Sequence, residues 1–331
     1  MILMVALLES YKDRVEKINE YIMRSLEVVE NKNLKAAMAH YPQAGGKRLR
    51  PLLATISCEA VGGRWNAAMP FGAALELVHN FTLVHDDVMD NDETRRGIKT
   101  VHTQYGVPEA ILAGDALFAR AFELIPDSDT HDDRLVQLVD IIAKAVRLLA
   151  EGQQMDMDFE GRKSVKDTEY MKMIELKTAV LYSAAAQGGA VIGESSEQEE
   201  EALREYGRLV GLGFQIWDDV LDLTSDQKTF GKPVLNDIRN GKKTLIVISA
   251  LEDLHGKERE ELFKALGNKK ATPEQLVAAR DVLDRAGAID HAIETANGLV
   301  KGAKEKLNVL KDTKHKKCLE SFADYTVTRK T

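Results

Sequence analysis

The spacing of the apolar residues constrains this chain more than any other feature. Between residues 10 and 30 they recur every three or four positions, at Tyr11, Val15, Ile18, Ile22 and Leu26. That spacing places them on one face of an α-helix. The same period continues almost to the end, and 7 prolines and 6% aromatic residues in 331 residues are too few for a β-sandwich. The sequence therefore predicts an all-α protein.

The breaks between the periodic segments divide the chain into a series of predicted helices. Breaks fall at stretches rich in Gly, Ser, Asp or Pro, such as YPQAGG and RRGIKT. No linker separates the segments, so we expect a single domain over residues 1–331. No run of about 18 apolar residues is present, so no membrane span is predicted. The expected helices cover residues 10–30, 34–41, 48–61, 69–91, 108–124, 132–160, 167–192, 197–222, 242–253, 257–266, 273–286, 289–307 and 313–326.

Charge and cysteine content limit the expected partners. With 45 Lys and Arg against 53 Asp and Glu, the formal net charge is −8, which argues against a nucleic-acid-binding protein. An acidic chain that binds an anionic substrate must gather its basic residues locally. Cys58 and Cys318 form neither a disulfide framework nor a metal-binding spacing, so we expect free thiols and a cytoplasmic location.

Two acidic clusters share the pattern DDxxD, each at the end of a long apolar segment. The first lies in LVHDDVMDND at residues 83–92, and the second in IWDDVLDLT at residues 216–224. Residues four apart lie on the same side of a helix, so Asp86 stacks with Asp90. Like charges at this spacing destabilise a helix unless cations lie between them. The clusters consist of Asp86, Asp87, Asp90, Asp218, Asp219 and Asp222.

The ligand type indicates the metal. Neither cluster has a Cys pair or a group of His residues beside it, and all-oxygen ligands suit a hard cation, Mg²⁺ or Mn²⁺, rather than zinc. A calcium-binding loop starting at Asp90 is excluded, because Arg95 stands where such a loop needs glycine and Val101 where it needs glutamate. Mg²⁺ commonly shares its coordination sphere with phosphate oxygens, so the clusters predict a phosphate-bearing ligand nearby.

Basic residues flank both clusters in glycine-bearing breaks. GGKRLRP places Lys47, Arg48 and Arg50 at a junction between a loop and a helix, where free backbone N–H groups also favour anions. His79 precedes Asp86 by seven residues and so lies on the same face, two turns earlier. Two separate diphosphates would require a basic set of this size. The set continues with Arg95, Arg96, Lys177, Lys232, Lys242 and Lys243.

These stretches, in this order, resemble the trans-isoprenyl diphosphate synthases of the polyprenyl synthetase family. The resemblance runs from about residue 35 to the end, and two aspartate motifs together with GGKRLRP are a highly specific combination. It implies antiparallel helices around a deep central cavity, and a homodimer. The matching segments are GGKRLRP (45–51), HDDVMDNDETRRG (85–97), GQQMD (152–156), KTA (177–179), FQIWDDVLD (214–222), GK (231–232) and GKKT (241–244).

The resemblance also implies a reaction, the head-to-tail condensation of isopentenyl diphosphate with an allylic diphosphate. About three Mg²⁺ ions would assist the release of pyrophosphate. Their direct ligands would be Asp86, Asp90 and Asp218, supported by Asp87, Asp219 and Asp222. The allylic diphosphate would contact Arg95, Lys177, Lys232 and Lys242, and oxygens of Thr178 and Gln215 would face the allylic cation. Isopentenyl diphosphate would contact Lys47, Arg50, His79 and Arg96.

The chain departs from the family pattern at two positions beyond the second motif. Leu235 stands where glycine is common, and Ile246 stands where a proline often follows Thr244 and Leu245. Both departures bear on the rate or the closure of the enzyme. They leave every charged group in place.

Phe81 and Thr82 are the candidates for setting product length. They precede Asp86 by about 6 to 7.5 Å along a helix axis at about 1.5 Å per residue, close to the length of one isoprene unit. A large ring at Phe81 would shorten a tunnel, although an ordinary core position is an equal alternative. Within the family the pattern resembles synthases of geranylgeranyl diphosphate (C20), with farnesyl (C15) and geranylfarnesyl (C25) diphosphate as alternatives. Phe81→Ala is then expected to lengthen the product.

Two other classes of protein remain open at this point. A class I terpene cyclase also uses an aspartate-rich helix, but its second metal motif usually mixes Asn or Asp, Ser or Thr, and Glu. It has no need for Lys47, Arg50 and His79, and it would form hydrocarbon from the allylic diphosphate alone. A non-catalytic subunit of a heteromeric synthase commonly lacks one aspartate motif, whereas this chain keeps both.

Overall fold

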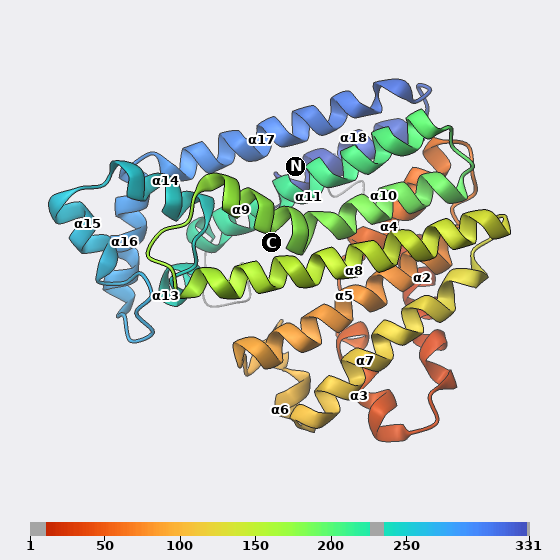
Figure 1. The fold of residues 1–331 in the computed structure, drawn as a ribbon, viewed down its shortest axis with the longest axis horizontal. Coiled ribbons are helices and arrows are strands. Elements are labelled where there is room, and N and C mark those ends of the chain that lie inside the picture. Colours follow the sequence, from red (N-terminus) through yellow and green to blue (C-terminus); the bar gives the residue numbers. More distant parts are fainter. Residues whose placement is uncertain (1–10, 226–234, 330–331) are drawn as a thin grey trace. The chain divides into compact units, whose positions relative to one another are not determined.

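The computed structural model describes residues 11–225 and 235–329, and this part of the chain is almost entirely helical (Figure 1). Two short strands, β1 (Thr94–Arg95) and β2 (Ile98–Lys99), pair as an antiparallel hairpin. No other strand occurs in the described residues. The prediction of an all-α protein is confirmed.

The chain divides into two compact units. The single domain expected over residues 1–331 stays a prediction. The first unit comprises residues 1–146, 181–207 and 306–322, and the second comprises residues 147–180, 208–305 and 323–331. Within the first lie α2 (Lys12–Ser25), η1 (Leu26–Val28), α3 (Lys32–Gln43), α4 (Leu49–Ala60), α5 (Met69–Asp90), β1, β2, α6 (Val101–Tyr105), α7 (Val107–Leu124), η2 (Ile125–Asp127) and η4 (Leu307–Val309). Within the second lie α9 (Asp167–Ile174), the π-helical turn η3 (Glu175–Ala179), α13 (Asn236–Asn240), α14 (Leu245–Asp253), α15 (Gly256–Phe263) and α16 (Pro273–Arg285). Residues of both units are found in α8 (Asp132–Glu160), α10 (Val180–Ile192), α11 (Glu197–Thr224), α17 (Ala288–Lys306) and α18 (Lys314–Thr326).

Every expected helix is present, with ends shifted by a few residues. The structure adds elements inside two predicted breaks, because the hairpin and α6 lie within 94–105 and α13 lies within 236–240. The helix expected over 167–192 is interrupted by the π-helical turn. A π-turn inserts one residue into a helix, and the resulting shift in phase does not show in the apolar pattern because nearly every residue of α10 is buried.

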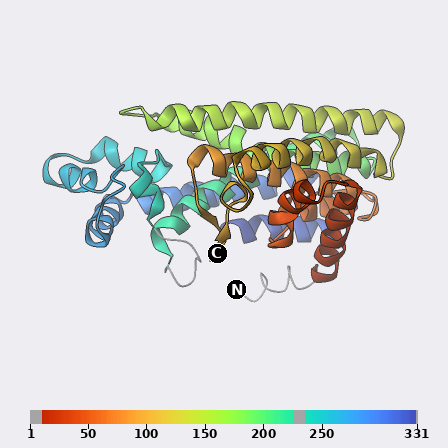
Figure 2. The ribbon, with the colours of Figure 1, turned by 90° about the horizontal axis from the view of Figure 1, so that it is seen from below.

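In the first unit, α5 packs between α4 and α7 and is apolar on most sides (Figures 1 and 2). Phe71, Leu75 and Val78 on α5 are fully buried. The contact with α7 is close, because a Cβ atom at Gly114 would lie 2.1 Å from the His85 ring. A glycine at this position therefore lets α5 and α7 approach each other along the segment that precedes the first acidic cluster.

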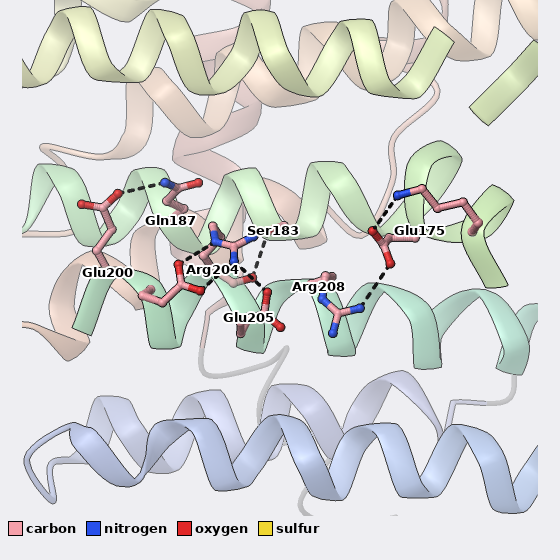
Figure 3. Close-up of polar contacts among 9 residues, drawn as sticks. Glu175, Ser183, Gln187, Glu200, Arg204, Glu205 and Arg208 are labelled. Carbon is pink, nitrogen blue, oxygen red and sulfur yellow. Dashed lines mark hydrogen bonds and ion pairs between the residues drawn. The ribbon is translucent and has the colours of Figure 1, made fainter. Parts of the chain in front are cut away.

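Polar side chains of the first unit join α8, α10 and α11. The amides of Gln137 and Gln187 each donate to Glu200 Oε1 at 2.8 Å. Ser183 Oγ donates to the carbonyl oxygen of Arg204 at 2.9 Å, and Figure 3 shows this contact beside the Gln187–Glu200 contact. These hydrogen bonds satisfy half-buried polar groups between the helices, so they fix the register of α10 on α11 within this unit.

In the second unit, α11 packs on α17 through another close contact. A Cβ atom at Gly213 would lie 3.4 Å from both the carbonyl oxygen of Ala296 and Val300 Cγ2. Further along the chain, α14 begins at a Thr244 cap whose side chain accepts from Val247 N at 3.4 Å. Its first residues are buried. The apolar faces of α11, α14 and α17 supply much of the core of this unit.

Two glycine substitutions with opposite expected effects test the packing in the first and second units. A Cβ atom at Gly189 on α10 would lie 2.2 Å from the backbone oxygen of Ala54. Gly189→Ala should therefore lower the free energy of unfolding by about 1–3 kcal/mol or more, because backbone cannot move aside. On α17, a Cβ atom at Gly298 would have no atom within 4 Å. Gly298→Ala should therefore raise the free energy of unfolding by up to about 1 kcal/mol through helix propensity. Urea denaturation measures both, and equal effects would contradict the packing described.

Candidate active site

The first acidic cluster ends α5 in the first unit, and its members differ in exposure. Asp87 is fully buried, whereas Asp86 is half-buried and Asp90 is exposed. Arg95 donates from Nε and from Nη2 to Asp87 Oδ1, each at 2.7 Å. The Tyr41 hydroxyl donates to the other carboxylate oxygen. Asp87 therefore joins α5 to α3 and to β1, a supporting position rather than an open one.

The environment of Asp87 has opposing effects on its ionisation. Burial raises the pKa of Asp87, whereas the charge of Arg95 and the hydrogen bonds from Tyr41 and Arg95 oppose that rise. Burial also raises the pKa of Tyr41, and the hydrogen bond to Asp87 raises it further. The hydroxyl therefore remains a donor, and the carboxylate keeps its charge because a guanidinium group faces it at hydrogen-bonding distance.

The segment GGKRLRP forms a tight loop before α4 in the first unit. Arg48 adopts a left-handed conformation with φ 49° and is 3% exposed. Its guanidinium donates to Glu76 Oε1 at 2.8 Å, to Asn19 Oδ1 at 2.6 Å and to the carbonyl oxygen of Pro42 at 2.6 Å. Arg48 is thus an internal clamp of the loop, held by a buried carboxylate. Sequence reasoning placed it at this junction but had no signal for its partners, which are distant in the sequence.

Gly46 separates two guanidinium groups in this loop. A Cβ atom there would lie 3.1 Å from Arg48 Nη1 and 3.2 Å from Arg96 Nη1, and its φ is +154°. Arg96 Nη1 donates to the carbonyl oxygen of Gly45 at 2.9 Å. The loop and the β1–β2 hairpin are therefore joined by an arginine from each side, with no room for a side chain between them.

His79 lies among these arginines on α5. Burial first, and then the charges of Arg50, Arg96, Arg95 and Arg48, lower the pKa of His79 well below its ordinary 6.5. The imidazole is therefore neutral near pH 7 and can donate or accept a hydrogen bond. Arg50 also lies over the Tyr182 ring at 4.7 Å. The first unit thus gathers the predicted residues Arg50, His79 and Arg96 in one region, while Lys47 lies on the exposed side of the same loop.

The three aspartates of the second cluster point to three different partners in the second unit. Asp219 Oδ2 accepts from the Tyr170 hydroxyl at 2.6 Å, and Asp222 Oδ2 accepts from the backbone N–H of Asp237 at 3.1 Å. Asp218 Oδ1 accepts from Arg329 Nη2 at 2.9 Å. Burial and then the charge of Asp237 raise the pKa of Asp222 to about 7. They also raise the pKa of Asp219.

The donor set of the second cluster fits a hard divalent cation. The carboxyl pKa values of Asp219 and Asp222 rise because of burial first and the negative charge of Asp237 second, and a bound cation would offset both effects. Asp237 joins the cluster from α13, and only the structure reveals it. Within residues 11–225 and 235–329, no three His, Cys, Asp or Glu side chains converge tightly enough to hold a metal ion by themselves.

Thr178 and Gln215 meet in the second unit. The Thr178 hydroxyl donates to Gln215 Oε1 at 2.8 Å, and Gln215 Nε2 donates to Asp219 Oδ1 at 3.0 Å. The amide is therefore fixed with its oxygen toward Thr178. The Tyr170 hydroxyl donates to the other carboxylate oxygen of Asp219. A continuous chain of hydrogen bonds therefore runs from the π-helical turn through α11 to α9.

The π-helical turn also carries Lys177, whose ammonium lies 2.5 Å from Asp156 Oδ2 on α8. A Cβ atom at Gly152 would lie 2.4 Å from the backbone nitrogen of Lys177, so α8 approaches this turn closely. At the start of the turn, Glu175 accepts from Lys172 and from Arg208, each at 3.3 Å (Figure 3). π-turns are common at functional sites. The sequence assigns no role to Asp156 within GQQMD (152–156), and the structure shows that it is the partner of Lys177.

The sequence predicts two further lysines at the allylic diphosphate. Lys232 falls outside the described residues. Lys242 is exposed and lies 3.5 Å from Asp237 Oδ1.

The structure describes both positions at which the chain departs from the family pattern, Leu235 and Ile246. Leu235 has φ 65°, a left-handed conformation that glycine adopts without strain. A leucine there is strained by about 1–2 kcal/mol, offset by burial of a side chain that is 6% exposed. Ile246 lies in the first turn of α14, where a proline would lose no helical hydrogen bond. Neither departure displaces a charged group.

The predicted length-setting residues lie on α5, beside α7. The Phe81 ring packs against Phe118 at 5.4 Å and against His85 at 5.0 Å between ring centroids. Phe122 follows Phe118 on α7 at 5.2 Å. Thr82 is 8% exposed, and its hydroxyl donates to the carbonyl oxygen of His79. A row of half-buried aromatic rings therefore runs along this helix pair.

Comparison with known proteins shows the family of this chain. Residues 31–283 match the family described as polyprenyl synthetase. The chain is 41% identical over 327 residues to a geranylgeranyl diphosphate synthase of Methanosarcina mazei, with 99% of each chain covered. It is 36% identical over 333 residues to a geranylfarnesyl diphosphate synthase of Natronomonas pharaonis, with 96% of each covered. The crystal structure of geranylgeranyl pyrophosphate synthetase from Pyrococcus horikoshii has a TM-score of 0.92 at 43% identity, covering 98% of both chains.

The chain therefore belongs to the polyprenyl synthetase family. It is a prenyltransferase of the short-chain type. None of the described helices has the length and the apolar character needed to cross a membrane.

The lowered pKa of His79 predicts a pH dependence of stability. In the unfolded chain His79 has its ordinary pKa of 6.5, so below that pH the unfolded state binds a proton that the native state does not. The native state therefore loses stability as the pH falls. Between about pH 7.5 and about pH 5.5, the wild type should lose more free energy of unfolding than His79→Gln. Urea titrations measure both, and His255→Gln, at an exposed histidine, should behave as the wild type. Equal losses in all three proteins would contradict the prediction.

Proposed function

We propose that this protein condenses isopentenyl diphosphate with allylic diphosphates in a Mg²⁺-dependent reaction, and that its main product is geranylgeranyl diphosphate. The observation that carries the proposal is the set of arginines around the neutral His79, in a chain of net charge −8. An acidic protein gains from such a set when it binds a highly charged anion. The relatives named as geranylgeranyl diphosphate synthases support the C20 product.

The basic cluster of the first unit would bind isopentenyl diphosphate. Arg48 is neutralised by Glu76, so it shapes the loop, while Lys47, Arg50 and Arg96 supply the charge for the anion. His79 is kept uncharged, and as a neutral imidazole it adds a hydrogen bond without adding to the repulsion among the arginines.

The second unit would bind the allylic diphosphate and face the developing cation. Lys177 and Lys242 are each paired with a carboxylate, at Asp156 and Asp237, and would donate to the leaving diphosphate. The set that the sequence predicts for this diphosphate also includes Lys232 and, from the first unit, Arg95. Gln215 keeps its amide oxygen toward Thr178 because Asp219 holds its nitrogen. Fixed dipoles of this kind stabilise a cation without reorganising during the reaction.

The aspartate clusters would hold about three Mg²⁺ ions, or Mn²⁺, with Asp86, Asp90 and Asp218 as direct ligands. Asp87, Asp219 and Asp222 would support them from buried positions. When bound, the metal would stabilise the charge on the departing pyrophosphate. Members of the family generally depend on a divalent metal ion.

We also propose that the protein is a homodimer located in the cytoplasm. Exposed apolar side chains gather on α7 and on the N-terminal half of α8, with Ile111 45%, Leu112 59% and Val136 71% exposed. An apolar face of this kind suits a second copy. Free thiols at Cys58 and Cys318 are typical of a reducing compartment.

The activity assay tests the proposed function directly. Purified protein is incubated with Mg²⁺, labelled isopentenyl diphosphate and dimethylallyl, geranyl or farnesyl diphosphate in turn, and dephosphorylated products are separated by chromatography. We expect a C20 alcohol with each primer, and loss of product with EDTA. Asp218→Asn should lower kcat by at least about 100-fold, because it weakens electrostatic stabilisation of the leaving group. Hydrocarbon formed from the allylic diphosphate alone would point to a cyclase, and no product would point to a non-catalytic subunit.

Phe81→Ala tests whether the aromatic row on α5 and α7 limits product length. Removal of the ring opens about one turn of helix, close to one isoprene unit, so we expect C25 or longer products to replace C20. Product length is again read by chromatography. Phe263→Ala, at an exposed phenylalanine on α15, serves as the control and should leave the C20 product unchanged. An unaltered product from Phe81→Ala would make Phe81 an ordinary core residue.

A further inference from the structure

Arg329 covers one turn of α11 at the second acidic cluster. Its guanidinium lies 4.1 Å from the centre of the Phe214 ring, and Nη2 donates to the Phe214 carbonyl oxygen at 3.4 Å and to Asp218 Oδ1 at 2.9 Å. Its own carbonyl oxygen accepts from Trp217 Nε1 at 3.0 Å. Positions 214, 217 and 218 share one helix face. The segment after α18 is therefore anchored on the face that carries Asp218.

The anchored guanidinium is buried, and not all of its N–H donors form hydrogen bonds. Arg329 is 5% exposed, and its Nε is buried without a hydrogen-bond partner. Asp218, in contrast, has a side chain that is 46% exposed. Arginine has several donors that normally find acceptors when buried. This arrangement leaves a positive charge with spare donor capacity beside an open carboxylate.

The position of the charge matters because Asp218 belongs to a cluster with excess negative charge. Asp219 and Asp222 lie on the same helix, and Asp237 reaches the cluster through its backbone N–H, which donates to Asp222 Oδ2 at 3.1 Å. Arg329 supplies a cation at the member of the cluster that is most open to solvent. A divalent cation at the same carboxylate would be repelled by the guanidinium, since two cations with three positive charges between them would then share one negative charge.

We propose that Arg329 is a positioning residue that holds Asp218 in place of a metal ion, so that a divalent cation binds there tightly only together with a diphosphate. This inference rests on the proposed function, in which Asp218 is a metal ligand. A diphosphate supplies the negative charge that lets the guanidinium and the metal occupy the same region. Arg329 thus couples metal binding to substrate binding and disfavours a metal-loaded site without substrate.

Binding of Mn²⁺, followed by electron paramagnetic resonance of the free ion, tests the proposal without an activity measurement. In the absence of diphosphate, Arg329→Gln should bind Mn²⁺ roughly tenfold more tightly than the wild type, the scale of a unit charge acting on a divalent ion across one carboxylate in water. Arg329→Lys keeps the charge and should stay close to the wild type. With inorganic pyrophosphate present, the difference between wild type and Arg329→Gln should shrink.

Arg259→Gln is the matched control. Arg259 also lies over a phenylalanine ring, at 5.3 Å from the centre of Phe263, and donates to carbonyl oxygens at Leu251 and Leu254. Within the part of the chain that the structure describes, it makes no hydrogen bond or ion pair with a carboxylate of the aspartate cluster, so its removal should leave Mn²⁺ affinity unchanged. Thermal denaturation of each variant verifies that it is folded.

Trp217 provides a second readout. The chain has 2 tryptophans, so in a Trp65→Phe background the emission reports on Trp217 alone. Addition of Mg²⁺ with inorganic pyrophosphate should shift that emission, because the charges would then bind beside Asp218, next to Trp217 and to the carbonyl of Arg329 that Trp217 Nε1 contacts. Mg²⁺ without pyrophosphate should produce a smaller shift.

The outcomes separate the inference from the proposed function. Equal or weaker Mn²⁺ binding by Arg329→Gln would overturn the inference while leaving Asp218 as a metal ligand. If Asp218→Asn leaves Mn²⁺ binding with pyrophosphate unchanged, the metal assignment of the proposed function fails, and the inference fails with it. Tighter binding by Arg329→Gln alone, reversed by pyrophosphate, supports both.

Discussion

The burial of carboxylates beside fixed donors is the constraint on which this structure depends. Asp87 is fully buried and is held by Tyr41 and Arg95, and Asp219 is buried and held by Tyr170 and Gln215. The two tyrosines come from helices far away in the sequence, whereas Arg95 and Gln215 lie near their aspartates along the chain. Removal of a donor would leave a buried charge without a partner, which costs far more than an ordinary hydrogen bond. The same aspartates that make the chain acidic therefore hold separate helices together within each unit.

The basic region of the first unit follows a complementary rule. Like charges gather there because one of them is already neutralised, with Arg48 paired to the buried Glu76, and because His79 carries no charge. The loop geometry depends on Gly46, whose position admits no side chain between Arg48 and Arg96. The internal ion pair of Arg48 and Glu76 thus fixes the shape of the loop, and the remaining cations can bind an anion from solution.

The sequence predicted the helices and the acidic clusters well, because both depend on local spacing. The period of apolar residues identified α5 and α11, and the DDxxD pattern located their acidic ends. The partners of those carboxylates could not be predicted, since Tyr41 and Tyr170 carry no motif and lie tens of residues away. The π-helical turn was not predicted for another reason: nearly every residue of α10 is buried, so the shift in phase caused by one inserted residue cannot be read from the apolar pattern. Arg329 shares the first difficulty, because it is a single basic residue with no motif around it and lies far from Asp218 along the chain.

The π-helical turn at residues 175–179 has a consequence for how this enzyme can change during evolution. Deletion of one residue there would restore a regular α-helix, but it would rotate the residues beyond the deletion by about 100° relative to those before it. Lys177 would then leave Asp156, or Thr178 would leave Gln215, whichever side the deletion fell on. Substitutions around this turn can accumulate one at a time, whereas a change in its length breaks one of these contacts in a single step. The surplus residue is therefore preserved by the geometry of its neighbours, even though its removal would improve the helix that contains it.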